Sequence, residues 1–74
     1  MDDRLCMYTI YDHPRDYPEK FVVRRCVVMA TGEIEHLDGY ACDTLEQARA
    51  LVPPGLFCQP RQTEDDPVIV ETWF

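Results

Sequence analysis

The sequence contains no serine, only three glycines and no long apolar run, and each shortage excludes a class of function. Without serine, the chain cannot form a Ser-His-Asp catalytic triad. Three glycines are too few to build a phosphate-binding or dinucleotide-binding loop alongside the turns of a small fold. No stretch approaches the roughly 18 apolar residues of a membrane-spanning helix, and residues 1–4 do not begin an export signal. We therefore expect a cytoplasmic, non-enzymatic protein that uses no cofactor and contacts no membrane.

The length and charge of the chain narrow the remaining classes. Its 74 residues predict one small domain spanning residues 1–74. A chain of this size buries only about 60% of its unfolded surface, so we expect a thin core formed by one sheet and one covering element. The 14 acidic residues outnumber the 7 basic ones and give a net charge of −7. This charge argues against direct nucleic-acid binding and favours a protein partner with a basic surface.

The four cysteines do not form a known metal-binding or redox motif. They are separated by 20, 16 and 16 positions, and no pair has Cys-x-x-Cys spacing. In a reducing cytosol we expect thiols that pack as small hydrophobic side chains, with no bound metal. A disulfide that joins two copies of the chain is an alternative. The residues concerned are Cys6, Cys26, Cys42 and Cys58.

Aromatic and β-branched residues predict a sheet of four to five strands. The expected strands are residues 5–11, 21–29, 33–37, 56–58 and 68–74. The second is apolar on both faces and belongs near the sheet centre, whereas the third is an edge strand closed by a turn at Asp38 and Gly39. On the second strand, Arg24 and Arg25 are adjacent and point to opposite faces, so each is expected to pair with a neighbouring acid.

One short helix is predicted after the third strand. Either Asp43 or Thr44 can cap it, and Gln47 stands three residues after Thr44 in a capping-box pattern. The prolines and glycine of residues 53–55 end the helix. Its apolar stripe consists of Leu45, Ala48, Leu51 and Val52. The element order β-β-β-α-β-β predicts an α+β fold, with a small antiparallel or mixed sheet and the helix packed on one face.

Two acidic loops are the candidate partner-binding sites. We expect one contact patch in the first loop and a second patch in the loop before the last strand, aided by an exposed aromatic side chain. The predicted contact residues are Asp12, Asp16, Tyr17 and Glu19 in the first loop, and Glu64, Asp65 and Asp66 in the second. Such carboxylates can imitate a phosphate backbone and occupy the basic groove of a nucleic-acid-binding protein. The alternative is a solvated acidic face that keeps a small protein soluble.

An enzymatic alternative is centred on His13. Its imidazole would act as a general base, oriented by the carboxylate of Asp12 or Asp16. The competing interpretation of the same residues is a loop stiffened by Pro14 and Pro18.

Four segments carry a resemblance to known proteins. Residues 8–14 (YTIYDHP), 21–25 (FVVRR), 44–49 (TLEQAR) and 53–56 (PPGL) resemble a family of short uncharacterised bacterial and phage-associated proteins. In size and acidity the chain is also similar in kind to anti-CRISPR proteins, which phages and other mobile elements use to block host nucleic-acid-guided nucleases. The resemblance implies no catalytic residue. It implies an inhibitor that binds subunits of a CRISPR effector in the bacterial cytoplasm. The alternative is a housekeeping or phage accessory module, with a homodimer formed through an unpaired edge strand.

Overall fold

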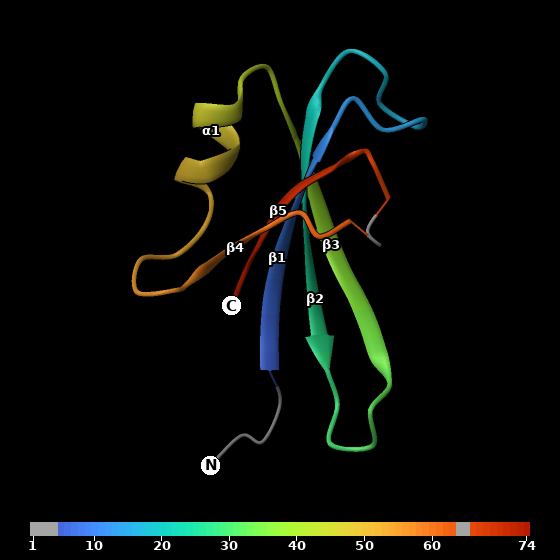
Figure 1. The fold of residues 1–74 in the computed structure, drawn as a ribbon, viewed down its shortest axis with the longest axis vertical. Coiled ribbons are helices and arrows are strands. Elements are labelled where there is room, and N and C mark those ends of the chain that lie inside the picture. Colours follow the sequence, from blue (N-terminus) through green and yellow to red (C-terminus); the bar gives the residue numbers. More distant parts are fainter. Residues whose placement is uncertain (1–4, 64–65) are drawn as a thin grey trace.

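The computed structural model describes residues 5–63 and 66–74 and contains a five-stranded antiparallel sheet with one short helix (Figure 1). The elements are β1 (Leu5–Asp12), β2 (Phe21–Val28), β3 (Ile34–Cys42), α1 (Leu45–Ala50), β4 (Cys58–Pro60) and β5 (Ile69–Trp73). Their order across the sheet is β3-β2-β1-β5-β4, and every neighbouring pair is antiparallel. The predicted α+β class and the edge position of the third strand are confirmed.

Strand β3 is longer than predicted, because Asp38 and Gly39 do not form a turn. Asp38 pairs with Arg25 and Gly39 pairs with Arg24, so the strand continues to Cys42. Pairing is maintained because β2 stays extended down to Phe21, which pairs with Cys42, so each residue from Asp38 to Cys42 has a partner on β2. A register shift at Arg25/Cys26 produces a bulge in the β2–β3 ladder.

The short strand expected at residues 56–58 is also displaced and forms at Cys58–Pro60. Phe57 still exchanges two backbone hydrogen bonds with Phe74, at 2.8 and 3.0 Å, just before β4 begins. The chain therefore joins the sheet edge where predicted, but the regular ladder of β4 with β5 involves the next three residues.

Helix α1 begins as the capping pattern predicts. The Thr44 hydroxyl accepts a hydrogen bond from the Gln47 backbone N–H at 3.1 Å, and the Gln47 side-chain oxygen accepts one from the Asp43 N–H at 3.0 Å. The first bond satisfies a backbone donor that the first turn leaves without an intrahelical partner, and the second ties the residue before the N-cap to the helix. The helix ends at Ala50, and Gly55 then turns the chain with φ of +90°.

The hydrophobic core lies between α1 and one face of the sheet. The buried residues of this cluster are Ile10, Val23, Cys42 and Ala48. Leu45 and Val52 pack against this cluster, but Leu51 is 47% exposed, so its predicted place in the apolar stripe is wrong. Leu51 is the C-cap of the six-residue helix, and the following residue, Val52, takes the core position instead.

The cysteines divide into two buried and two exposed free thiols. Cys26 and Cys42 are buried as predicted, whereas the expectation of burial is wrong for Cys6 and Cys58. Cys6 lies near the start of β1, away from α1, and Cys58 lies on the short edge strand β4. Burial raises the pKa of the Cys26 and Cys42 thiols.

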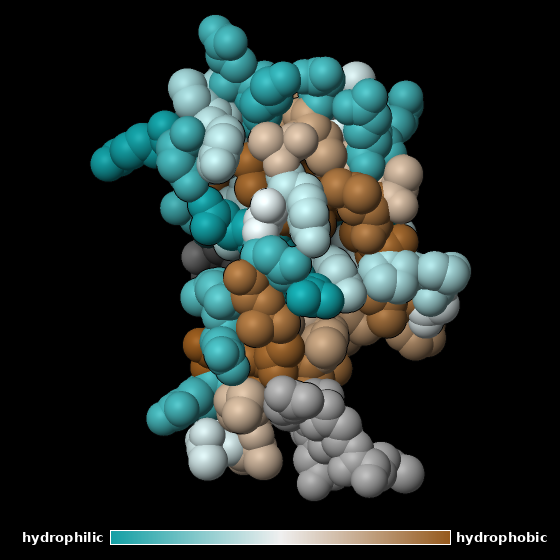
Figure 2. Space-filling model, turned by 180° about the vertical axis from the view of Figure 1, so that it is seen from behind, coloured by the Kyte–Doolittle hydropathy of each residue, from teal (hydrophilic) through white to brown (hydrophobic). Residues whose placement is uncertain are grey.

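The face away from the core helix carries the alternate side chains of β2, including Val22 and Arg24. Seen from behind the view of Figure 1, the molecule has an apolar cluster below its middle, and hydrophilic side chains form most of its upper rim (Figure 2). Within the described ranges, no helix is long and apolar enough to cross a membrane.

Candidate functional site

The two acidic loops, distant in the sequence, lie at the same end of the sheet. Strands β1 and β5 are antiparallel neighbours, so the loop that follows β1 and the loop that precedes β5 come together. The Asp12 backbone N–H donates to the Val68 carbonyl at 2.6 Å and joins the two loops directly. The sequence predicted a patch in each loop and left open whether the two meet, and the described members share one end of the sheet.

We call this surface the acidic end and define it by Asp12, Asp16, Tyr17, Glu19 and Asp66, all of which are exposed. The predicted contact residues Glu64 and Asp65 lie outside the described residues.

The phenol of Tyr11 lies close enough to both loops for carboxylates of each to influence its pKa. Burial raises the pKa of its phenol, and the nearby Arg24 guanidinium opposes this rise. The carboxylates of Asp66 and Asp16 add to the increase. Asp66, from the second loop, and Asp16, from the first, therefore act on the same group.

Asp12 and His13 form a side-chain pair through Oδ1 and Nδ1. His13 has a left-handed backbone with φ of 51°, and its ring meets Phe21 edge-on with centroids 5.2 Å apart. Its backbone N–H donates to the Lys20 carbonyl at 2.9 Å. The enzymatic alternative requires such a pairing of Asp12 with His13. Both side chains are exposed, however, and their contacts hold the base of the loop.

The arginines of β2 pair with acids on opposite faces of the sheet, as predicted. Arg24 donates to the Asp16 carboxylate, and its guanidinium carbon lies 5.6 Å from the centre of the Tyr11 ring. Arg25 donates to Asp38 through two nitrogens, at 2.9 and 3.3 Å. The charge of Asp16 is therefore partly balanced within the protein, whereas Asp66 forms no ion pair with residues 5–63 or 66–74.

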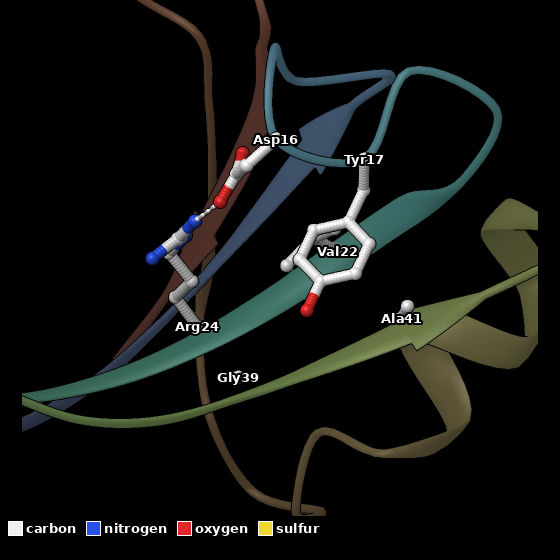
Figure 3. A pocket seen from close by; sticks show the side chains of 6 residues that line it. All are labelled: Asp16, Tyr17, Val22, Arg24, Gly39 and Ala41. Atoms are coloured by element: carbon white, nitrogen blue, oxygen red, sulfur yellow. Dashed lines mark hydrogen bonds and ion pairs between the residues drawn. The ribbon is translucent and has the colours of Figure 1, made fainter.

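A pocket of about 200 Å³ lies on the face away from α1, next to the acidic end (Figure 3). Its floor consists of two cross-strand pairs, Val22 with Ala41 and Arg24 with Gly39. Tyr17 projects from the first loop toward this floor, and the Asp16–Arg24 pair lies on one side. Two of the predicted contact residues, Asp16 and Tyr17, therefore line a concave surface.

The loop that carries Tyr17 is held by hydrogen bonds at both ends. The Tyr17 N–H donates to the Pro14 carbonyl at 2.9 Å, and the Lys20 N–H donates to the Tyr17 carbonyl at 3.2 Å. The Lys20 ammonium also pairs with Asp43 at the start of α1, and this hydrogen bond raises the pKa of Lys20. Lys20 therefore links the Tyr17 backbone to the start of α1 and helps to hold Tyr17 over the sheet.

Sequence reasoning missed Gly39 and Ala41 as site residues. Gly39 was assigned to a turn because Asp-Gly is a strong turn signal. A signal against this was present in Tyr40, Ala41 and Cys42, a short apolar run in which tyrosine favours a strand.

Sequence reasoning also missed a buried polar cluster under α1. Glu71 of β5 is only 5% exposed and accepts hydrogen bonds from Arg49 at 2.8 and 3.1 Å. The Trp73 indole N–H donates to the same carboxylate at 2.6 Å. The Arg49 hydrogen bonds lower the pKa of Glu71 despite its burial. This cluster joins the helix to β5 and has a structural role.

Among residues 5–63 and 66–74, no group of three or more His, Cys, Asp or Glu side chains is placed to hold a metal ion. No family model matches the chain, and comparison with curated proteins and with solved structures finds no match either. The resemblance to phage-associated and anti-CRISPR proteins therefore stays a prediction.

Proposed function

We propose that this chain is a non-enzymatic protein that binds a basic surface of a partner protein through its acidic end. The observation that carries the proposal is the convergence of the two acidic loops at one end of the sheet, joined by the Asp12–Val68 backbone hydrogen bond. Carboxylates gathered in one place produce a stronger local potential than the same charges spread over the surface.

The intramolecular ion pairs leave this end with negative charge available to a partner. Lys20, Arg24, Arg25 and Arg49 each pair with an acid of the same chain. At the acidic end, Glu19 and Asp66 form no ion pair within the part of the chain that the structure describes, and Asp12 pairs only with His13. The net charge of the molecule, −7, has the same sign. Long-range attraction would therefore speed association with a basic surface.

The partner class that fits this surface is a protein with a groove for nucleic acid, because its cationic lining is built to bind phosphates and also accepts carboxylates. Subunits of a CRISPR effector are the instance that the sequence resemblance suggests. Binding there would block access of nucleic acid, and no chemical step by this chain is needed.

The test is capture of effector subunits by the tagged protein from bacterial lysate that contains an assembled CRISPR effector, treated with nuclease to remove bridging nucleic acid. Wild type should recover the subunits, and the triple variant Asp12→Lys, Glu19→Lys, Asp66→Lys should lose at least nine-tenths of the signal. Glu46→Lys, which reverses an exposed acid on α1, should bind as wild type. Equal recovery by all three proteins, with circular dichroism showing an intact fold, would refute the proposal.

A second candidate function is an accessory module that dimerises through β3. It is favoured by the exposure of this edge strand, in which Cys42 is the one buried residue. Light scattering with and without reductant tests it. A dimer that persists under reductant indicates strand association, whereas a dimer lost under reductant indicates a disulfide through an exposed thiol, Cys6 or Cys58.

A further inference from the structure

Gly39 is a glycine that neither the backbone nor the packing of this protein requires. It lies in the interior of β3 without the positive φ that Gly32 and Gly55 have. A Cβ added at Gly39 would meet its nearest atoms at 3.6 to 3.9 Å, which are ordinary contacts. Glycine inside a strand destabilises it, and such a glycine often marks a bulge or a place where another chain or ligand approaches closely. The bulge of β3 falls between His36 and Asp38, whereas Gly39 pairs with Arg24 in regular register.

The absence of a side chain at Gly39 keeps the pocket open. The bare surface of Gly39 and the methyl group of Ala41 form its shallow outer floor, and Tyr17 stands above the inner floor at Val22. A larger side chain at Gly39 would project into this space. The opening lies on β3, the strand at the sheet edge.

The two edges of the sheet differ in the protection they have against pairing with another strand. Strand β4 has three residues and ends in a proline, which are common protections of an edge. Strand β3 has nine residues and exposes the large apolar side chains of Ile34, Leu37 and Tyr40. Its bulge at the Arg25/Cys26 register leaves a regular stretch from Asp38 to Cys42 beside the pocket. This stretch can accept an additional strand through its outward backbone groups.

We infer that an extended, basic segment of the partner protein pairs with residues 38–42 of β3 and places an aromatic side chain over Gly39, beside Tyr17. An aromatic side chain on a neighbouring strand covers the backbone that a strand glycine leaves bare. The Arg24 guanidinium, which has Tyr11 near it, and the Tyr17 ring offer further aromatic contacts. This inference rests on the proposed function, since it identifies how the basic partner is held.

Charge favours a basic segment over a second copy of this chain. Glu33 and Glu35 are exposed at the hairpin end of β3, and Glu19 is exposed in the loop that carries Tyr17. Two copies would each carry a net charge of −7 into the contact, and like charges repel. Lysine or arginine side chains of a basic segment would instead be attracted to these carboxylates, to Glu19 near the pocket and to Glu35 farther along β3.

The test is a nuclear magnetic resonance titration of the isotopically labelled protein with three blocked peptides. The first alternates lysine and threonine around a central phenylalanine, the second has alanine in the centre, and the third keeps phenylalanine but replaces lysine by glutamate. The first peptide should shift the amide signals of residues 38–42 and slow their exchange with solvent. It should also bind at least tenfold more tightly than either of the others.

Two pairs of variants locate the contact. Gly39→Val should weaken binding of the first peptide at least tenfold, whereas Gln59→Val, which places the same valine on the opposite edge strand, should not. Tyr17→Ala should weaken binding in the same way, and Tyr40→Ala, an equally exposed tyrosine on β3, should have a smaller effect. Failure of the first peptide to bind, equal binding of the phenylalanine and alanine peptides, or wild-type affinity in Gly39→Val would overturn the inference.

Other outcomes separate this inference from the proposed function. If the acidic-end triple variant loses the effector while Gly39→Val retains it, the proposed function stands and the β3 contact is wrong. If the lysine and glutamate peptides bind equally, the preference for a basic partner fails as well. If residues 38–42 are already protected from exchange in a dimer of the free protein, the occupant of β3 is a second copy and the inference is overturned.

Discussion

Removal of the Glu71 carboxylate is the perturbation whose cost the structure defines best. In Glu71→Ala, the indole N–H of the part-buried Trp73 loses its acceptor. A buried donor left unsatisfied costs roughly 1–3 kcal/mol, and the partial exposure of Trp73 places its own cost toward the lower end of this range. The Arg49 side chain is 49% exposed, so water replaces much of what its guanidinium loses. The full cost of roughly 3–5 kcal/mol for breaking a fully buried ion pair is therefore an upper bound. We expect a loss of about 2 kcal/mol.

For a domain of this size, a loss of about 2 kcal/mol lowers the melting temperature by roughly 8–16 °C. The assay is urea unfolding followed by the fluorescence of Trp73, the single tryptophan, and by far-ultraviolet circular dichroism. Glu71→Gln keeps an oxygen acceptor for Trp73 but loses the ion pair, so it should cost less than Glu71→Ala. Glu46→Ala on the exposed side of α1 is the control. A change below about 0.5 kcal/mol in Glu71→Ala, or an equal change in the control, would refute the reasoning.

The same residue predicts a dependence of stability on pH. Because Arg49 holds the pKa of Glu71 below its ordinary value of 4.5, the unfolded chain binds a proton more readily than the folded one. The resulting stabilisation is present above about pH 4.5 and is lost as the pH falls through the lower folded pKa. The difference in unfolding free energy between wild type and Glu71→Gln should therefore shrink in acid. A difference that stays constant from pH 7 to pH 3 would contradict this.

Three further predictions concern single elements of the fold. Gly39→Val should raise the free energy of unfolding by about 1 kcal/mol, because a β-branched residue suits a strand. Gly55→Val should lower the free energy of unfolding by about 1 kcal/mol or more, because valine is strained at the Gly55 φ of +90°. Urea unfolding measures both changes. Thr44→Ala should cost about 1 kcal/mol through loss of the helix cap, and an unchanged urea midpoint would argue against that cap. In native protein a thiol reagent should modify Cys58 but should reach Cys26 only after unfolding, and equal rates measured by mass spectrometry would contradict the assigned burial.

Local signals in the sequence predicted the elements well because each depends on neighbouring residues. The cap at Thr44 needs only Gln47 three positions later, and the ends of β2 follow from an apolar run. The pairing of Arg24 and Arg25 with acids on opposite faces follows from strand alternation.

Contacts between distant segments could not be predicted in this way. The meeting of the Asp16 loop with Asp66 depends on β5 lying beside β1, and the sequence does not specify that neighbour. The ion pair between Arg49 and Glu71 likewise depends on where α1 lies over the sheet. Gly39 was misassigned because Asp-Gly favours a turn locally, but pairing with β2 kept the strand extended.

The most direct test of the proposed function is competition between this protein and nucleic acid for one purified CRISPR effector. Fluorescence anisotropy of a labelled target DNA, bound to the effector, is followed as the protein is added. Wild type and Glu46→Lys should displace the DNA with equal potency, and the acidic-end variant Asp12→Lys, Glu19→Lys, Asp66→Lys should require at least tenfold more protein. DNA that stays bound at saturating wild-type protein, or displacement that is equal for the triple variant, would contradict the proposal that the acidic end occupies a nucleic-acid groove.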